Sequence, residues 1–395
     1  MKKYRICVVT GTRAEYGLLR NLLFRFRDNC KVDLKLVVTG SHLSEKFGNT
    51  QKEVLTDGFK NIIKLKIEDT DENKESMSVS TADAIEKFSN YFVLNRPDIL
   101  VILGDRYEIF AAAVAANFLG ITIAHISGGD VTEGAIDDSI RHCITKMSYL
   151  HFPGCAQSAK RIIQMGESPD RVFNVGEPGV ENCLNMKFMS IEELVKSIDF
   201  DISDGNYSVV TYHPVTMENN TACEQIYELI YAMEEKNDMK YIITMANADA
   251  GGQLINNIWL KEAKKHNNWF ITPSLGVIRY ISTVKYAKLV IGNSSSGIVE
   301  APVLETPTIN MGDRQKGRMM AESIISCQPK KEDIVNAMNY ALEKTFQNKL
   351  KGLISPFGDG TTSEKIEKII LNFMTNNKVT EQIHQKKFYD IDFNI

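Results

Sequence analysis

Short β-branched runs alternate with helical patterns from the first residues onward, and this alternation restricts the fold more than any other feature. Residues 5–10, 33–39, 99–103 and 121–125 are predicted strands, each followed by a turn signal. Between the second and third, Ile85, Phe88 and Phe92 recur at helical spacing, and Pro97 stops that helix before the next strand. Such an order predicts a mostly parallel sheet covered by helices.

The same pattern begins again in the second half. Weaker strands at 151–152 and 172–175 are expected to complete a first sheet, and the linker is placed at residues 176–179. Further strands are predicted at 207–212, 240–244, 269–271, 289–291 and 308–311. The expected fold is α/β, with two Rossmann-like doubly wound domains at residues 1–178 and 179–363. Residues 364–395 are expected to form a C-terminal helix and tail.

Composition excludes several classes of partner. The net charge of -4 gives no general attraction to nucleic acid or to an anionic membrane, so any phosphate must be bound locally. The apolar stretch 109–126 is interrupted by polar residues and is interpreted as a buried helix followed by a strand rather than a membrane span. The 7 cysteines include no Cys-x-x-Cys pair, and no export signal is visible, so a cytoplasmic protein is expected.

Ligands of doubly wound sheets bind beyond the carboxyl ends of the strands, so the loops there are the candidate sites. In residues 10–17 a helix is expected to start near Tyr16, and its N-terminus together with Arg13 would suit a phosphate. A tight turn with a solvated arginine fits equally well, because neither the Rossmann nor the Walker pattern is present. After the third strand come Asp105 and Arg106; Asp105 is either a base or a helix cap.

Residues 125–142 hold the densest collection of ionisable groups. The pair Gly128 and Gly129 would allow the backbone to approach a ligand. Four carboxylates within nine residues are expected to repel one another and to raise at least one pKa, as acid/base catalysis requires: Asp130, Glu133, Asp137 and Asp138. In the alternative reading, the last two only begin a helix, and His125 is a satisfied core histidine.

The second half offers groups suited to a nucleotide. His213 follows a predicted strand, where a histidine can donate a proton to a leaving phosphate. Residues 291–300 have the order of strand, small-residue loop and helix that forms an anion site, with Glu300 placed to accept from ribose hydroxyls. Arg314 follows the next strand. No histidine or aspartate spacing suggests a metal site, and no metal or other cofactor is predicted.

These motifs together resemble the hydrolysing UDP-N-acetylglucosamine 2-epimerases of sialic acid biosynthesis. The resemblance covers about the first 320 residues and is carried by Gly11-Thr12-Arg13-Ala14-Glu15, Gly104-Asp105-Arg106, His125-Ile126-x-Gly128-Gly129, Asp137-Asp138-Ser139-Ile140-Arg141-His142, His213-Pro214, and Gly292-Asn293-Ser294-Ser295 through Glu300. It implies the glycosyltransferase-B architecture, with the two domains facing a cleft that holds the substrate and the terminal helix crossing back to the first domain. It also implies a homodimer or homotetramer.

The resemblance further implies a reaction. A base removes the proton on carbon 2, UDP leaves from carbon 1 to give a 2-acetamidoglucal, and water adds to release N-acetylmannosamine. Asp105 and Asp137 would be acid/base residues, and Glu300 would hold the ribose. The remaining substrate contacts implied or predicted are Arg13, Arg106, His213, Asn247, Ser294, Ser295 and Arg314.

One residue departs from the family pattern. Well-known members have glutamate where this chain has Ser127, and serine cannot take over a carboxylate's proton transfer. Our hypothesis is that Asp130 or Glu133 supplies the missing group, since the loop is one residue longer after Asp130. The change is also consistent with a related substrate, UDP-N,N'-diacetylbacillosamine, although the sequence favours UDP-N-acetylglucosamine.

Three rival functions remain open at the level of sequence. A retaining glycosyltransferase of the same architecture would also use a glutamate in the position of Glu300, but has no evident need for the carboxylates of residues 130–138. A non-hydrolysing epimerase would retain UDP on the sugar. A catalytically silent nucleotide-sugar sensor would bind UDP without turnover.

Overall fold

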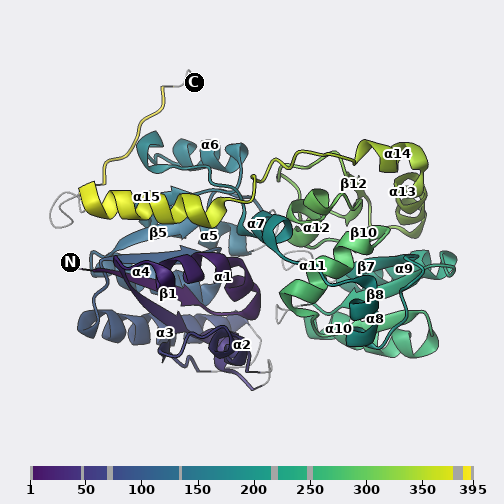
Figure 1. Cartoon of the computed structure of the whole chain (residues 1–395), viewed down its shortest axis with the longest axis horizontal. Coiled ribbons are helices and arrows are strands. Elements are labelled where there is room, and N and C mark those ends of the chain that lie inside the picture. Colours follow the sequence, from purple (N-terminus) through teal and green to yellow (C-terminus); the bar gives the residue numbers. More distant parts are fainter. Residues whose placement is uncertain are drawn as a thin grey trace. The chain divides into compact units, whose positions relative to one another are not determined.

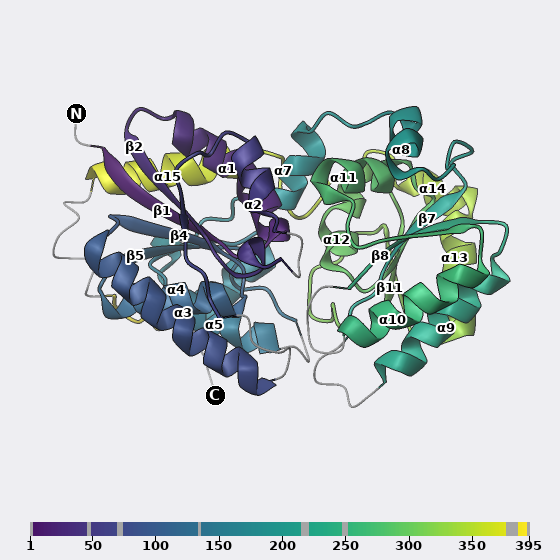
Figure 2. The same cartoon turned by 90° about the horizontal axis from the view of Figure 1, so that it is seen from below.

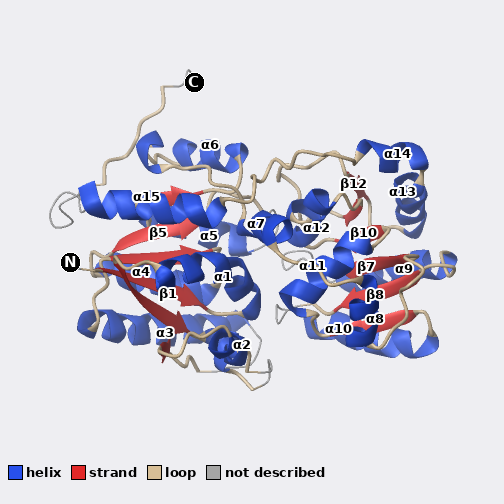
Figure 3. Ribbon diagram, in the orientation of Figure 1, coloured by secondary structure: helices blue, strands red, loops and turns tan. Residues whose placement is uncertain are grey.

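The computed structural model describes residues 3–45, 49–68, 74–132, 136–214, 221–246, 252–376 and 386–392. The chain divides into two compact units. The first comprises Met1–Asp130, Asp137–Asn182 and Phe357–Ile395, and the second comprises Val131–Ile136 and Cys183–Pro356. Each unit contains one parallel sheet with helices on both faces (Figure 3). The C-terminal segment therefore belongs to the first unit.

The sheet of the first unit has six parallel strands in the order β3-β2-β1-β4-β5-β6. The strands are β1 (Tyr4–Thr10), β2 (Val32–Val38), β3 (Ile62–Lys64), β4 (Ile99–Leu103), β5 (Thr122–Ile126) and β6 (Leu150–Phe152). Nearly every residue of β1, β4 and β5 is buried, because helices cover both faces of the sheet.

Two apolar clusters hold this sheet between its helices. On one face, Leu19 and Phe26 of α1 and Ile370 of α15 pack together with β1 and β4. On the other face, Phe88 of α3 and the alanines of α4 pack against the same strands, and Figure 2 shows the two sets of helices on opposite sides. The helices of the first unit are α1 (Arg13–Asp28), α2 (Gln51–Thr56), α3 (Lys74–Leu94), α4 (Tyr107–Phe118), α5 (Ile136–Met147), α6 (Ala156–Gln164), α7 (Pro178–Asn185) and α15 (Thr362–Asn376), with 3-10 turns η1 (Gly40–Leu43) and η2 (Pro169–Arg171).

The second unit repeats this architecture. Its six parallel strands lie in the order β12-β11-β10-β7-β8-β9, which is the same doubly wound order read from the other side (Figure 1). They are β7 (Tyr207–Thr211), β8 (Lys240–Thr244), β9 (Trp269–Thr272), β10 (Leu289–Gly292), β11 (Thr308–Met311) and β12 (Ile324–Cys327). The helices are α8 (Ile191–Ile198), α9 (Ala222–Glu235), α10 (Gly252–Glu262), α11 (Gly276–Tyr286), α12 (Ser295–Val299), α13 (Lys331–Leu342) and α14 (Lys344–Lys349), with η3 (Ala263–Lys265) and η4 (Ala301–Leu304).

The predicted two-sheet, doubly wound α/β fold is confirmed. The prediction of a strand at 172–175 is wrong, because only Val172 forms a bridge, to His151, and the segment continues as coil. The short strands β3 and β12 were not predicted. The stretch 109–126 comprises most of α4 followed by β5, as expected. Among the described residues, no helix combines the length and the apolar character that a membrane span needs.

Candidate active site

The topology brings the candidate residues to one edge of each sheet. All strands within a sheet are parallel, so the loops that follow neighbouring strands meet at its carboxyl edge. In the first unit these are the loops after β1, β4, β5 and β6. In the second unit, the loops after β7, β10 and β11 carry His213, Asn293 and Arg314.

The loop after β1 does not present its first backbone N–H groups to a ligand. Helix α1 begins earlier than expected, with Thr12 as its N-cap and Glu15 completing a capping box. Oε2 of Glu15 accepts hydrogen bonds from the backbone N–H groups of Gly11 and Thr12 at 2.7 and 3.2 Å. An internal carboxylate therefore occupies the predicted phosphate position at these two groups. The side chain of Arg13 is 32% exposed, with Nη1 3.8 Å from Oε1 of Glu53.

A second buried carboxylate lies beneath this loop. Glu108 of α4 is fully buried and accepts a hydrogen bond from Nε of Arg106 at 3.0 Å. Gly11 has room only for hydrogen, because a Cβ there would stand 2.6 Å from Cγ of Glu108. Burial, with Glu108 adding to it, raises the pKa of Glu15 to about 8. Burial therefore favours the protonated form of Glu15.

The fold should therefore become less stable as the pH rises. A carboxyl group whose folded pKa exceeds its unfolded value contributes stability that is complete below the unfolded pKa, 4.5, and is lost as the pH passes about 8. We expect Glu15→Gln to reduce the fall in melting temperature between about pH 5 and pH 8.5, each pKa unit being worth about 1.4 kcal/mol. Thermal melts of the wild type and of Glu15→Gln across this pH range measure the fall in melting temperature. The exposed Glu86→Gln is the control, and an unchanged slope in Glu15→Gln would contradict the account.

The loops after β4 and β5 are joined by Arg141 of α5. Its side chain is 5% exposed; Nη2 donates to Oδ2 of Asp105, and Nη1 donates to the main-chain oxygen of Asp130 at 2.9 Å. Asp105 is therefore not a helix cap; the N-cap of α4 is Arg106, without a side-chain cap hydrogen bond. The buried positive charge of Arg141 offsets part of the repulsion expected between the carboxylates that follow β4 and β5. Sequence reasoning gave Arg141 no role of its own.

The β5 loop is shaped by close packing. A Cβ on Gly128 would stand 2.8 Å from Nδ1 of His125, and one on Gly129 would stand 2.4 Å from the main-chain oxygen of Ser158. The glycine pair is thus needed for packing within the unit. His125 is the satisfied core histidine of the alternative reading, with Nε2 2.8 Å from the main-chain oxygen of Gly104. Burial lowers its pKa to about 4.

Two of the four predicted carboxylates lie in the first turn of α5. The positive end of the helix dipole stabilises the negative charges of Asp137 and Asp138. Both residues therefore begin a helix, as the alternative interpretation predicted. Oδ1 of Asp138 lies 3.9 Å from Nη1 of Arg141. Asp130 accepts a hydrogen bond from the hydroxyl of Ser158 at 2.5 Å. Glu133 lies outside the described residues.

In the second unit, Asn293 links the loop after β10 to the loop after β7, a structural role that the sequence did not predict. Its Oδ1 accepts from the backbone N–H of His213 at 2.7 Å, and its Nδ2 donates to the main-chain oxygen of His213 at 2.8 Å. The main-chain oxygen of Asn293 in turn accepts from Nη1 of Arg314 at 2.9 Å and from Nε2 of Gln315 at 2.8 Å. The network brings His213 and Arg314, both predicted site residues, to the same edge.

The imidazole of His213 is neutral in this environment. Burial, followed by the charge of Arg314, lowers its pKa to about 3. Its Nδ1 is buried and has no hydrogen-bond partner within the described part of the chain. A buried polar atom in this condition, next to an arginine, fits an anionic ligand that would supply both the partner and the opposite charge.

We expect UDP to raise the pKa of His213, because a diphosphate counters both the desolvation and the charge of Arg314. NMR titration of the imidazole resonances with and without UDP measures the change. His125, whose pKa is also lowered by burial, is the internal control and should not respond. A His213 pKa unaffected by saturating UDP would contradict this placement.

Helix α12 carries the remaining predicted contacts. Ser294 is its N-cap and accepts from the backbone N–H of Ser296, while Ser295 is exposed in the first turn. The carboxylate of Glu300, at the end of α12, accepts a hydrogen bond from the hydroxyl of Ser296. Burial raises the pKa of Glu300. Asn247 lies outside the described residues.

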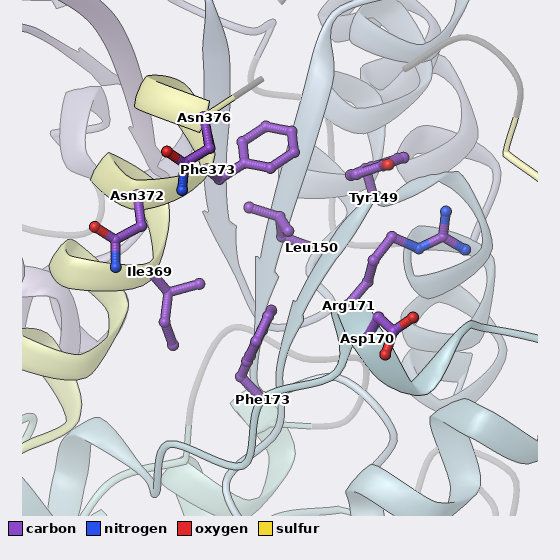
Figure 4. Close-up of a pocket in the computed structure, with 9 residues that line it drawn as sticks. All are labelled: Tyr149, Leu150, Asp170, Arg171, Phe173, Ile369, Asn372, Phe373 and Asn376. Carbon is purple, nitrogen blue, oxygen red and sulfur yellow. The ribbon is translucent and has the colours of Figure 1, made fainter. Parts of the chain in front are cut away.

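A separate pocket of about 390 Å³ lies in the first unit, away from these loops. It lies between α15 and the start of β6, and Figure 4 shows that its lining is mostly aromatic and aliphatic. Arg171 stacks over the ring of Tyr149 at its rim, with the guanidinium carbon 4.7 Å from the ring centroid. Because Leu150 is the first residue of β6, this pocket is at the amino edge of the sheet, opposite the candidate site.

Two doubly wound sheets, each with ionisable and hydroxyl side chains gathered at its carboxyl edge, define a two-unit α/β protein with the glycosyltransferase-B fold. The chain belongs to the UDP-N-acetylglucosamine 2-epimerase family, whose pattern matches residues 25–371.

Three relatives and one solved structure resemble the chain over most of its length. It is 39% identical to the hydrolysing GDP/UDP-N,N'-diacetylbacillosamine 2-epimerase of Campylobacter jejuni, over 89% of this chain and 90% of the relative. It is 37% identical to the polysialic acid biosynthesis protein P7 of Escherichia coli, over 99% and 98%. It is 32% identical to the hydrolysing UDP-N,N'-diacetylbacillosamine 2-epimerase of Legionella pneumophila, over 95% and 97%. The Neisseria meningitidis UDP-GlcNAc 2-epimerase bound to UDP-GlcNAc has the same fold, with a TM-score of 0.80 at 16% identity, over 93% of this chain and all of that one.

Proposed function

We propose that the protein is a hydrolysing 2-epimerase that converts a UDP-linked 2-acetamido sugar into UDP and the free sugar inverted at carbon 2. One observation carries the proposal. Asp105 and the Asp130 backbone are held together by a buried arginine at the carboxyl edge of the first sheet. A protein that only binds a nucleotide has no need for such an organised acid/base cluster.

The second unit holds the nucleotide in this proposal. Arg314 and the neutral imidazole of His213 contact the diphosphate, and the hydroxyls of Ser294 and Ser295 bind its oxygens. Glu300 accepts a hydrogen bond from the ribose. His213 gains a proton as the diphosphate raises its pKa, and it can donate that proton as UDP leaves.

The first unit supplies proton transfer at carbon 2. A carboxylate accepts the proton of carbon 2, the electron pair of that bond forms the double bond between carbons 1 and 2, and the bond from carbon 1 to the phosphate oxygen breaks. Water then adds its oxygen to carbon 1, while carbon 2 is protonated on the opposite face. Asp105 and Asp137 are the candidate acid/base residues, and the buried side chain of Arg141 holds the carboxylate of Asp105 in place.

Two sugars fit this chemistry. The names of the relatives at 39% and 32% identity favour UDP-N,N'-diacetylbacillosamine. The sequence motifs and the relative at 37% identity, named for polysialic acid biosynthesis, favour UDP-N-acetylglucosamine with N-acetylmannosamine as product. Both substrates share the UDP group and the acetamido group on carbon 2.

The test supplies each UDP-sugar separately to the purified protein, without metal or acceptor. UDP release is followed by chromatography and the freed sugar is identified by NMR. We expect UDP and a free 2-epimerised sugar from at least one substrate, and the ratio of the two kcat/KM values assigns the preferred one. Formation of the epimerised UDP-sugar without UDP release, or UDP binding without turnover, would contradict the proposal.

A further inference from the structure

The first residue after β5 is held against a carboxylate from a distant part of the chain. Oγ of Ser127 donates a hydrogen bond to Oε2 of Glu177 at 2.7 Å. The backbone of Ser127 has φ +60°, an uncommon conformation for a residue other than glycine, and its N–H donates to the main-chain oxygen of Phe152 at 3.0 Å. The surrounding fold therefore imposes the position of this serine.

Glu177 reaches this position because its segment runs alongside β6. The N–H of Phe173 donates to the main-chain oxygen of His151 at 2.9 Å, and that of Val175 donates to Pro153 at 3.2 Å. The N–H of Glu177 then donates to the main-chain oxygen of Phe357 at 2.7 Å, which anchors its backbone. The segment thus delivers Glu177 to the edge where β4, β5 and β6 end.

A gap in the β6 loop admits the glutamate side chain. Gly154 follows β6, and a Cβ there would stand 1.8 Å from Oε1, 2.3 Å from Cδ and 2.4 Å from Cγ of Glu177. No larger residue at position 154 leaves the carboxylate where it is. Glu177 is only 9% exposed, so its charge is held in a largely dry environment.

Inversion of carbon 2 requires proton carriers on two opposite faces of the sugar, because the proton leaves one face and returns on the other. The carboxylate of Asp105 is paired with Arg141, and that of Asp130 accepts from Ser158. We propose that Glu177, oriented by Ser127 and admitted by Gly154, is one of these carriers. This inference rests on the proposed function and replaces Asp130 and Glu133 as the source of the carboxylate beside position 127.

In the role of base, ionised Glu177 accepts the proton of carbon 2. The electron pair of that bond becomes the double bond, and the electron pair of the carbon 1–oxygen bond leaves with UDP. Glu177 then releases its proton to solvent. A second carboxylic acid protonates carbon 2 on the other face, and water gives hydroxide to carbon 1 and its remaining proton to the emptied carboxylate.

The test compares Glu177→Gln with Glu181→Gln, a matched buried glutamate on the same segment. Glu181 accepts hydrogen bonds from the N–H and the hydroxyl of Ser363, so its role is to attach α15. We expect Glu177→Gln to lower kcat about 100-fold or more, with KM and UDP affinity nearly unchanged. Glu181→Gln should lower the melting temperature and leave kcat near that of the wild type.

A relocated carboxylate separates a chemical role from a structural one. Ser127→Glu combined with Glu177→Gln places the charge in the same space from the other side, and we expect it to recover about tenfold of the lost kcat. Folding of every variant is checked by circular dichroism and UDP binding. Glu177→Gln with nearly full kcat, or no recovery in a folded double variant, would overturn the inference while wild-type turnover stands. A wild type that turns over neither UDP-sugar would overturn the proposed function and this inference together.

Discussion

Asp105→Asn is expected to lower kcat by a factor of about 10² to 10⁴, the usual worth of a positioned acid or base. The amide keeps the size of the side chain and can still accept from Arg141, but it can no longer carry a proton. The substitution also removes the negative charge closest to Arg141, whose side chain is only 5% exposed. We therefore expect a lower melting temperature together with the loss of turnover.

The control for this substitution is Asp138→Asn. Asp138 lies 3.9 Å from the same guanidinium and is 30% exposed, so it shares the electrostatic environment of Asp105 at longer range. Its loss should lower kcat by less than about tenfold. UDP affinity, measured by calorimetry, should be unchanged in both variants, because the proposed UDP contacts are in the second unit. Equal effects of the two substitutions on kcat would contradict the role given to Asp105.

Gly292→Ala is expected to prevent stable folding of the second unit. A Cβ on Gly292 would stand 1.9 Å from the main-chain oxygen of Thr211, on the neighbouring strand β7, and its φ is +133°. Backbone strain and overpacking together should cost about 3–6 kcal/mol. This residue also precedes Asn293, whose side chain holds the His213 loop, so UDP binding should be lost with the fold.

The matched control is Gly205→Ala in the same unit. Gly205 also has a positive φ, +67°, but a Cβ there would meet nothing within 4 Å. Only the conformational cost remains, about 1 kcal/mol. Denaturant melts followed by tryptophan fluorescence suit the comparison, since Trp259 and Trp269 both lie in the core of this unit. Similar stabilities for the two variants would show that the strands can separate at Gly292 without penalty.

The sequence predicted the central strands well because they are buried on both faces and therefore continuously apolar. The edge strands β3 and β12 were not predicted, because three or four partly exposed residues give too short a hydrophobic pattern to indicate a strand. The segment predicted as a strand at 172–175 contains two β-branched residues, but it pairs with β6 only through the bridge at Val172 and one further hydrogen bond, from Val175 to Pro153. The doubly wound order follows from the repeated strand-and-helix units.

The position of a candidate residue at the sheet edge was predictable where the residue follows a strand. Asp105, Asp130, His213 and Arg314 were placed there in this way, because parallel strands end at one edge. Side chains that reach this edge from elsewhere in the chain were not predicted. Arg141 lies within a helix. Glu177 lies in the predicted linker, and the absence of a side chain on Gly154 makes room for its carboxylate. The loop after β1 looked like a phosphate site because nothing in the sequence shows that Glu15 folds back onto it.

The central claim is tested most directly by turnover of the preferred UDP-sugar in deuterium oxide containing heavy-oxygen water. The account predicts a free sugar inverted at carbon 2 that carries one solvent deuterium there and heavy oxygen on carbon 1, together with unlabelled UDP. Heavy oxygen in the UDP would show cleavage at phosphorus, and hydrogen retained at carbon 2 would show that no proton is removed there. Either result would contradict the account.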